Sequence, residues 1–205
     1  MVSLCNFSHA SPGSSGEPSI YLQDRIDRSD KRYGSFNFAL QLLEERKAKT
    51  IVETGTARYG AKEFGGDGGS TIVFGDWASK HKAMLHSVDK SDEAIAKAKS
   101  ATQPYAKHIH YTCSESIPFL EKFEQKIDFL YLDSAGFDFN DPLPCQEHFL
   151  REIVSAYPFL HKKSVVMFDD CELPHGGQGK LAIEFLTDND WKIAYQGYQV
   201  ILTQD

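Results

Sequence analysis

Acidic side chains follow two apolar runs of this chain, and their positions suggest a shared site. Asp133 follows the run 127–132, and Asp169 and Asp170 follow the run 164–168. The ends of neighbouring parallel strands lie close together in a sheet. Three carboxylates there repel one another unless a cation neutralises them. Because Mg²⁺, Mn²⁺ and Ca²⁺ prefer oxygen ligands, these three residues predict a divalent metal site. In the alternative, one aspartate caps a helix and another faces solvent.

A second group of residues indicates a ligand that contains a ribose. Its members are Glu53, Thr54, Gly55 and Thr56 after the first buried run, Gly69, Ser70 and Thr71 at the start of the next expected helix, and Asp89 after the second run. Gly55 permits a tight turn, and backbone N–H groups at a helix start can approach a ligand closely. Asp89 is placed to accept hydrogen bonds from both ribose hydroxyls. In the alternative, Asp89 only forms a turn before the next helix.

Two histidines and one long loop are further candidates. His148, in an expected helix, and His175, in the loop after the acidic pair, are candidate general bases. In each case the alternative is a surface histidine without a catalytic role. The segment 58–67 is long and rich in glycine, which is typical of binding loops and lids. In the alternative, it is a surface loop with no ligand.

The elements that must position these residues alternate between strands and helices. Strands are expected at 50–53, 84–89, 108–112, 127–133, 164–169, 191–195 and 198–203. Helices are expected from Phe36 and at 70–78, 91–99, 117–123, 145–160 and 180–186. Such alternation predicts a parallel sheet covered on both faces. The last two strands, joined at Gln196-Gly197, predict a hairpin. The expected fold class is therefore α/β, Rossmann-like and doubly wound, with a mostly parallel seven-stranded sheet and a C-terminal antiparallel hairpin.

Length and composition limit the class of protein. The 205 residues fit one domain, which we expect at 19–205 after a flexible tail at 1–18. A net charge of −7 argues against nucleic acid as a partner. The four cysteines form no CxxC pair, no apolar run approaches the ~20 residues of a membrane span, and no signal-peptide pattern is present. We expect a reduced cytoplasmic protein without membrane contact, compatible with a homodimer.

Together these residues resemble class I methyltransferases that depend on S-adenosylmethionine (SAM), especially the branch of catechol-type, antibiotic and sugar O-methyltransferases. The resemblance covers about residues 35–205. Residues 53–56 and 69–71 look like the first motif of that family with an insertion. The resemblance implies that Asp89 binds the ribose of SAM and that Ser114 and Glu115 lie beside its adenine. It also implies that Asp133, Asp169 and Asp170 are metal ligands, as in the members that use a divalent cation.

The sequence departs from that branch after the fourth strand, where a histidine or lysine often follows the aspartate. Here Asp133 is followed by Ser134-Ala135-Gly136. The expected function is SAM-dependent O-methylation of a small-molecule or sugar-like hydroxyl, assisted by Mg²⁺ or Mn²⁺, with Asp133, His148 and His175 as the candidate catalytic residues. Two alternatives stay open. One is an NAD(P)-binding oxidoreductase, although the compact GxGxxG motif is absent, and the other is a non-catalytic protein that kept the fold.

Overall fold

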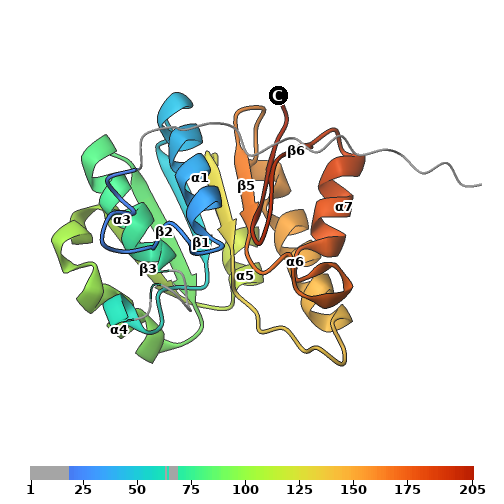
Figure 1. Cartoon of the computed structure of the whole chain (residues 1–205), viewed down its shortest axis with the longest axis horizontal. Coiled ribbons are helices and arrows are strands. Elements are labelled where there is room, and N and C mark those ends of the chain that lie inside the picture. Colours follow the sequence, from blue (N-terminus) through green and yellow to red (C-terminus); the bar gives the residue numbers. More distant parts are fainter. Residues whose placement is uncertain (1–18, 63, 65–68) are drawn as a thin grey trace, which may run out of the picture.

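The computed structural model describes residues 19–62, 64 and 69–205, and these contain one seven-stranded sheet (Figure 1). The strands are β1 (Thr50–Thr54), β2 (Met84–Asp89), β3 (Ile109–Cys113), β4 (Phe129–Leu132), β5 (Val165–Phe168), β6 (Lys192–Gln196) and β7 (Val200–Thr203). They are arranged in the order β3-β2-β1-β4-β5-β7-β6. The strand order reverses between β1 and β4, which is where ligands bind in sheets of this kind.

The pairing of the strands confirms the expected fold class. Strands β1 to β5 pair in parallel with their neighbours, while β7 runs antiparallel to both β5 and β6. The C-terminal hairpin is therefore present, and β7 rather than β6 joins it to the parallel strands. Its turn consists of residues 197–199, whereas the expected turn was Gln196-Gly197; Gln196 ends β6, and Tyr198, expected in the last strand, lies in the turn.

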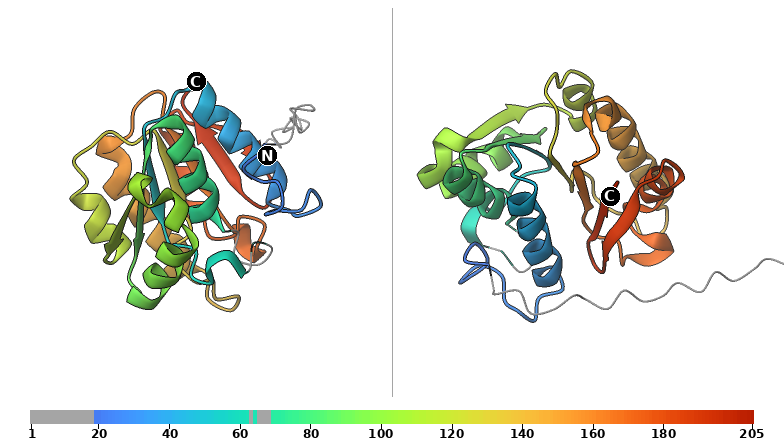
Figure 2. Two further views of the ribbon diagram at one scale, coloured as in Figure 1. Left: turned by 90° about the vertical axis from the view of Figure 1, so that its left-hand side faces the viewer. Right: turned by 90° about the horizontal axis from the view of Figure 1, so that it is seen from above.

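Helices cover both faces of the sheet, as the views from the side and from above show (Figure 2). One face carries α1 (Tyr33–Glu45) and α3 (Ser70–His81), and the other carries α5 (Ser116–Glu121), α6 (Leu143–Ala156) and α7 (Lys180–Asp188). Helix α4 (Asp92–Ala101) packs beside α3 near the β2 and β3 edge. Short 3-10 turns are η1 (Gly60–Lys62), η2 (Gln103–His108), η3 (Tyr157–Phe159) and η4 (Pro174–Gly176).

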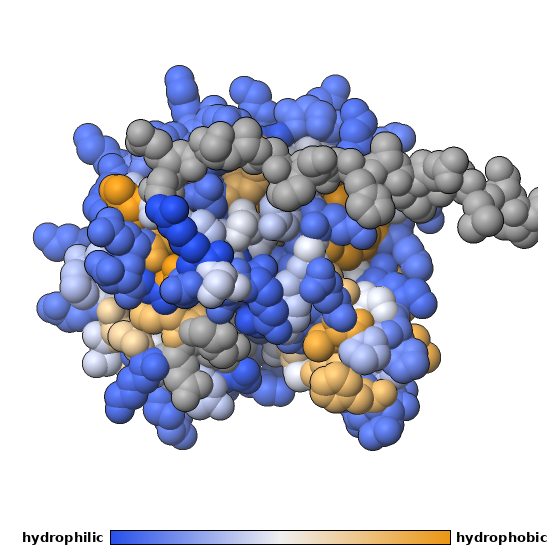
Figure 3. Space-filling view, in the orientation of Figure 1, coloured by the Kyte–Doolittle hydropathy of each residue, from blue (hydrophilic) through white to orange (hydrophobic). Residues whose placement is uncertain are grey.

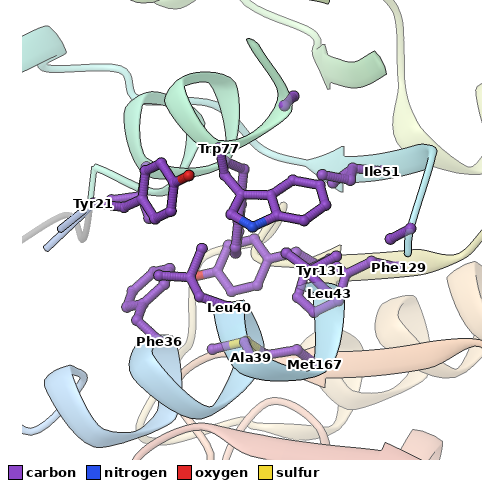
Figure 4. Packing of buried hydrophobic residues seen from close by; sticks show 14 of the residues in the cluster. Tyr21, Phe36, Ala39, Leu40, Leu43, Ile51, Trp77, Phe129, Tyr131 and Met167 are labelled. Atoms are coloured by element: carbon purple, nitrogen blue, oxygen red, sulfur yellow. The ribbon is translucent and has the colours of Figure 1, made fainter. Parts of the chain in front are cut away.

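Alternation along each strand divides the apolar residues between two cores. In β1, Ile51 belongs to the core under α1 and α3, whereas its neighbour Val52 belongs to the core under α5, α6 and α7. This follows from the twofold period of a strand, which sends consecutive side chains to opposite faces. Figure 4 shows the first core, where Phe36 of α1 and Trp77 of α3 meet Tyr131 of the sheet. Both faces being buried explains why the strands read as continuous apolar runs.

Two predictions made from the sequence concern segments that the structure does not describe, in whole or in part. The expected tail 1–18 and residues 63 and 65–68 of the long loop lie outside the described part. Hydrophilic side chains cover most of the face shown in Figure 3, with a few separate apolar patches. Across 19–62, 64 and 69–205, every helix is too short or too polar to cross a membrane.

Glu53 is the charged residue that fixes α3 onto the sheet. Its fully buried carboxylate accepts hydrogen bonds from Thr71 Oγ1 at 2.7 Å, from Ser87 Oγ at 2.7 Å and from the hydroxyl of Ser70. The donors come from the first turn of α3 and from β2, so the carboxylate joins three elements. Burial raises the pKa of Glu53 to about 7, although the three hydroxyl donors act in the opposite direction.

This pKa predicts a pH dependence of stability. Because folding raises the pKa from 4.5 to about 7, the folded state binds more protons than the unfolded state between these values, and the free energy of unfolding falls as pH rises through this window. The loss attributable to Glu53 is roughly 3 kcal/mol at 1.36 kcal/mol per pKa unit. Urea unfolding at pH 4.5 and 7.5 should show this loss in the parent and not in Glu53→Gln. In the exposed control Glu121→Gln, the free energy of unfolding should change between the two pH values as it does in the parent. The same change in all three proteins would contradict the assignment.

Candidate functional site

A cavity of about 520 Å³ lies at the carboxyl ends of the strands around β1. Its wall contains Gly55 after β1, Val88 and Asp89 of β2, the segment 114–116 after β3 and the segment 134–136 after β4. Glu93, Ala94 and Lys97 of α4 and His148 of α6 also line it. The cavity therefore includes the point where strand order reverses, as expected for a ligand site in an open α/β sheet.

The turn after β1 is shaped by Gly55. Its φ is +86°, and a Cβ at this position would lie 2.3 Å from the backbone oxygen of Asp133. Any side chain here would force the ends of β1 and β4 apart, so the close approach of the two strand ends requires glycine. Beyond the turn, Arg58 and Tyr59 line the cavity, and the Tyr59 side chain is 49% exposed. The described part of the long loop thus forms one wall of the cavity.

Asp89 serves both as a turn residue and as a wall of the cavity. Its Oδ1 accepts a hydrogen bond from the backbone N–H of Ser91 at 2.8 Å. Ser91 in turn caps α4, because its Oγ accepts from Ala94 N at 3.2 Å. The two interpretations of Asp89 made from the sequence are therefore compatible. The turn holds the carboxylate in place at the edge of the cavity, where a ligand hydroxyl can reach it.

Some of the residues predicted to bind a cofactor line the cavity, and others do not. Gly55, Asp89, Ser114 and Glu115 line it. The following predicted residues do not line it: Glu53, Thr54, Thr56, Gly69, Ser70 and Thr71. Thr71, for example, hydrogen-bonds to Glu53 and accepts from the backbone N–H of Ala57 at 2.8 Å. These residues stabilise the turn after β1 and do not form the surface of the cavity.

The two candidate histidines have different surroundings. The Nε2 atom of His148 lies 2.9 Å from Ser134 Oγ and 3.3 Å from Ser116 Oγ, at the cavity wall. His175 is exposed, lies in η4 with a φ of +62°, and does not line the cavity. Asp133 is placed beside Gly55 by the hydrogen bond from its N–H to Thr54 O at 3.0 Å, and its neighbour Ser134 lines the cavity.

The predicted metal site is not supported by the structure. Among the described residues, which include all three aspartates, His, Cys, Asp and Glu side chains form no group that could hold a metal ion. The cation beside Asp169 and Asp170 is instead Arg32, whose Nε lies 2.9 Å from Asp169 Oδ2 and whose Nη2 lies 3.1 Å from Asp170 Oδ1. The electrostatic argument for a positive partner was sound, but the protein supplies that partner itself.

Further donors complete the pairing of these two carboxylates. Tyr131 Oη donates to Asp169 Oδ2 at 2.6 Å, and Gln178 Nε2 donates to Asp170 Oδ2 at 2.9 Å. The hydroxyl of Tyr198 also donates to Asp170. Burial raises the pKa of Asp170, and the neighbouring charge of Asp169 acts in the same direction. The oxygens that a metal would need are therefore already engaged.

Sequence reasoning missed three residues of this region. Arg32 precedes the first expected helix, and nothing in the local sequence connects it with Asp169, 137 positions away. Ser134 was noted only because it stands where the related enzymes often have a histidine or lysine. Glu152, which accepts from Ser134 Oγ at 2.7 Å, gave the one available signal, because it follows His148 by four residues on the same helix face.

Comparison with known proteins agrees with this geometry. A family model described as a methyltransferase domain matches residues 63–171. No curated protein sequence matches the chain at a significant level. An O-methyltransferase of Bacillus cereus in complex with S-adenosylhomocysteine (SAH) superposes with a TM-score of 0.62 at 13% identity, covering 90% of this chain and 87% of that one.

Two further solved structures have the same fold. The SAH-bound methyltransferase PaMTH1 of Podospora anserina has a TM-score of 0.61 at 13% identity and covers 89% of this chain and 81% of its own. A TDP-rhamnose 3′-O-methyltransferase of calicheamicin biosynthesis has a TM-score of 0.57 at 14% identity, with coverages of 81% and 77%. With more than half of its length matched by the family model, the chain belongs to the methyltransferase domain family and has the class I SAM-dependent methyltransferase fold.

Proposed function

We propose that this methyltransferase uses SAM to methylate a hydroxyl group of a small molecule. The observation that carries the proposal is the cavity at the strand-order reversal, with the Asp89 carboxylate fixed at its wall. Structural neighbours named as O-methyltransferases, one of them acting on a TDP-sugar, support oxygen as the accepting atom. A cytoplasmic location, a homodimeric state and the absence of nucleic acid and membrane partners stay predictions.

The residues around the cavity fit the proposed cofactor. A volume of about 520 Å³ lies within the ~300–1,000 Å³ usual for small-molecule sites. Asp89 at the end of β2 can accept hydrogen bonds from the two ribose hydroxyls. Ser114 and Glu115, after the adjacent edge strand β3, then lie on the side where the adenine would be. Gly55 and the β1–β4 junction lie on the opposite side of Asp89, where the sulfonium would be.

In the proposed mechanism, the protein mainly orients the acceptor and removes its proton. SAM supplies a methyl group that its sulfonium already activates, so the remaining requirement is alignment of the accepting oxygen. Asp133, at the β1–β4 junction, accepts the hydrogen bond and then the proton of the acceptor hydroxyl. Arg58 and Tyr59, on the loop beside the cavity, limit the access of water.

No step of this mechanism passes through a metal ion at Asp169 and Asp170. Arg32 is 6% exposed and Asp169 is 1% exposed, and the single guanidinium of Arg32 pairs with both Asp169 and Asp170. The three aspartates named from the sequence thus divide into two roles. Asp133 remains at the proposed reaction centre, while Asp169 and Asp170 anchor the segment before α1 to the end of β5.

Binding of SAH measured by calorimetry tests the ribose contact. Asp89→Asn should keep one oxygen that accepts from Ser91 N–H, but it loses the negative charge and the second acceptor oxygen. Asp89→Ala should lose the charge and both acceptor oxygens. We expect the dissociation constant of Asp89→Ala to rise by the equivalent of about 1–3 kcal/mol, the effect of leaving buried polar groups unpaired. Asp92→Ala, three residues away and outside the cavity wall, is the control for charge. An unchanged affinity in Asp89→Ala would remove Asp89 from the site.

Steady-state kinetics with a panel of phenols, catechols and sugar hydroxyls tests Asp133. We expect Asp133→Asn to lower kcat by about 10²-fold or more, as general-base losses do, with little change in the affinity for SAH. Asp138→Asn is a matched control, because Asp138 lies in the same loop, is exposed and accepts from Asn140 N–H. Parent-level turnover in Asp133→Asn would assign the proton acceptor elsewhere.

Chemical unfolding tests the role of Arg32. Arg32→Met leaves the buried Asp169 carboxylate without its cation, so the free energy of unfolding should fall by about 3–5 kcal/mol. Lys97→Met removes the pair that Lys97 forms with the exposed Glu93, and should cost about 1 kcal/mol or less. Similar losses in the two variants, measured from urea titrations at pH 7, would show that the Asp169 pair is not the stronger contact.

A further inference from the structure

The contacts of His148 place it between Ser134, at the end of β4, and the segment that follows β3. His148 belongs to α6, and its ring contacts Ser116, the first residue of α5. Ser116 directly follows Ser114 and Glu115, the segment after β3 that lines the cavity. In the sheet, β3 is the edge strand and β2 separates it from β1. The ring is therefore next to the segment where the proposed cofactor would place its adenine.

A buried carboxylate determines which ring nitrogen of His148 carries the hydrogen. Glu152 is completely buried, and its Oε1 accepts from Ser134 Oγ at 2.7 Å. A hydroxyl group has a single hydrogen, so Ser134 cannot also donate to the ring. The contact of 2.9 Å between Ser134 Oγ and His148 Nε2 then requires the imidazole to donate from Nε2. The Nε2 atom lies 3.5 Å from Glu152 Oε1, which favours a hydrogen on this nitrogen.

The other ring nitrogen is left as an acceptor. In a neutral imidazole with its hydrogen on Nε2, Nδ1 carries a lone pair. Within 19–62, 64 and 69–205, Nδ1 of His148 has no hydrogen-bond partner, and the side chain is 26% exposed at the cavity wall. The ring therefore presents an unused acceptor to a ligand, and that ligand must offer an N–H or O–H group.

We infer that His148 recognises the adenine of the cofactor, with Nδ1 accepting a hydrogen bond from the exocyclic amino group, and that it is not the general base. This inference rests on the proposed use of SAM. Ser134 and Glu152 act on His148 from behind, as positioning residues that fix its tautomer. This role explains why Ser134 follows Asp133 in this chain, since the Ser134 hydroxyl connects the Glu152 carboxylate to the His148 ring.

Calorimetry with two probes tests the inference without an acceptor substrate. The probes are SAH and S-inosylhomocysteine, in which a carbonyl oxygen replaces the exocyclic amino group. The parent protein should bind SAH about five- to tenfold more tightly than S-inosylhomocysteine, the usual size of one hydrogen bond. His148→Ala should weaken SAH binding by a similar factor and bind the two probes nearly equally. His148→Gln, whose amide oxygen can also accept, should recover part of the preference.

Controls separate this inference from the proposed function and from misfolding. Glu147→Ala changes an exposed neighbour on the same helix and should keep the parent preference. Circular dichroism spectra and thermal melts show whether each variant is folded, and His148→Gln serves if His148→Ala is not. Parent-like affinity and preference in the folded His148 variants would overturn the adenine role while leaving SAM binding intact. Failure of the parent itself to bind SAH would instead overturn the proposed function, and the inference with it.

Discussion

The arrangement of this protein depends on how it keeps carboxylates inside a dry interior. Glu53, Glu152 and Asp169 are each 1% exposed or less, and a charge in such a place is costly unless it is paired and hydrogen-bonded. Each has a different solution. Glu53 collects three hydroxyl donors, and Asp169 takes Arg32 and a tyrosine hydroxyl. Glu152 accepts from Ser134 at Oε1, whereas its Oε2 has no hydrogen-bond partner among the described residues. Because each set of donors comes from distant elements, satisfying the charge also fixes those elements relative to the strand ends.

This requirement connects the framework to the cavity. The donors of Glu53 begin α3 and belong to β2, so the turn carrying Gly55 is held from below. Glu152 fixes Ser134 and, through it, His148 at the opposite wall. The cavity surface itself contains residues that leave acceptors or backbone exposed, such as Asp89 and Gly55. Residues that line the cavity, such as Asp89 and Gly55, are thus different from the residues that hold the strand ends, such as Glu53 and Glu152.

Local patterns in the sequence were sufficient to predict most of the fold. Each of the seven strands was located to within about two residues. Buried parallel strands read as short apolar runs, and turn residues separate the two strands of the hairpin. The helix at 91–99 was placed correctly from Ser91, whose side chain caps α4 as expected. The positions of Asp89, Ser114 and Glu115 at the cavity followed from the same reasoning, since they end strands that the pattern had already located.

Long-range pairing could not be predicted in this way. The rule that three neighbouring carboxylates need a cation is physically sound, but it does not say whether that cation is a metal ion or a side chain. The guanidinium of Arg32 comes from the other end of the chain, and only the packing of α1 against the sheet brings it to β5. In the same way, the helical spacing of His148 and Glu152 is visible in the sequence, whereas the serine between them in space is not.

The choice of an arginine rather than a metal ion has a consequence for the site. A bound ion exchanges with solvent and brings its own ligands and waters, so an acceptor can displace one of them. A guanidinium is part of the chain, presents its donors in a fixed plane, and cannot leave. Arg32 therefore makes the end of β5 a permanent structural junction. The chemistry that we propose belongs to the neighbouring end of β4, where Asp133 lies against the glycine turn and Ser134 connects to His148.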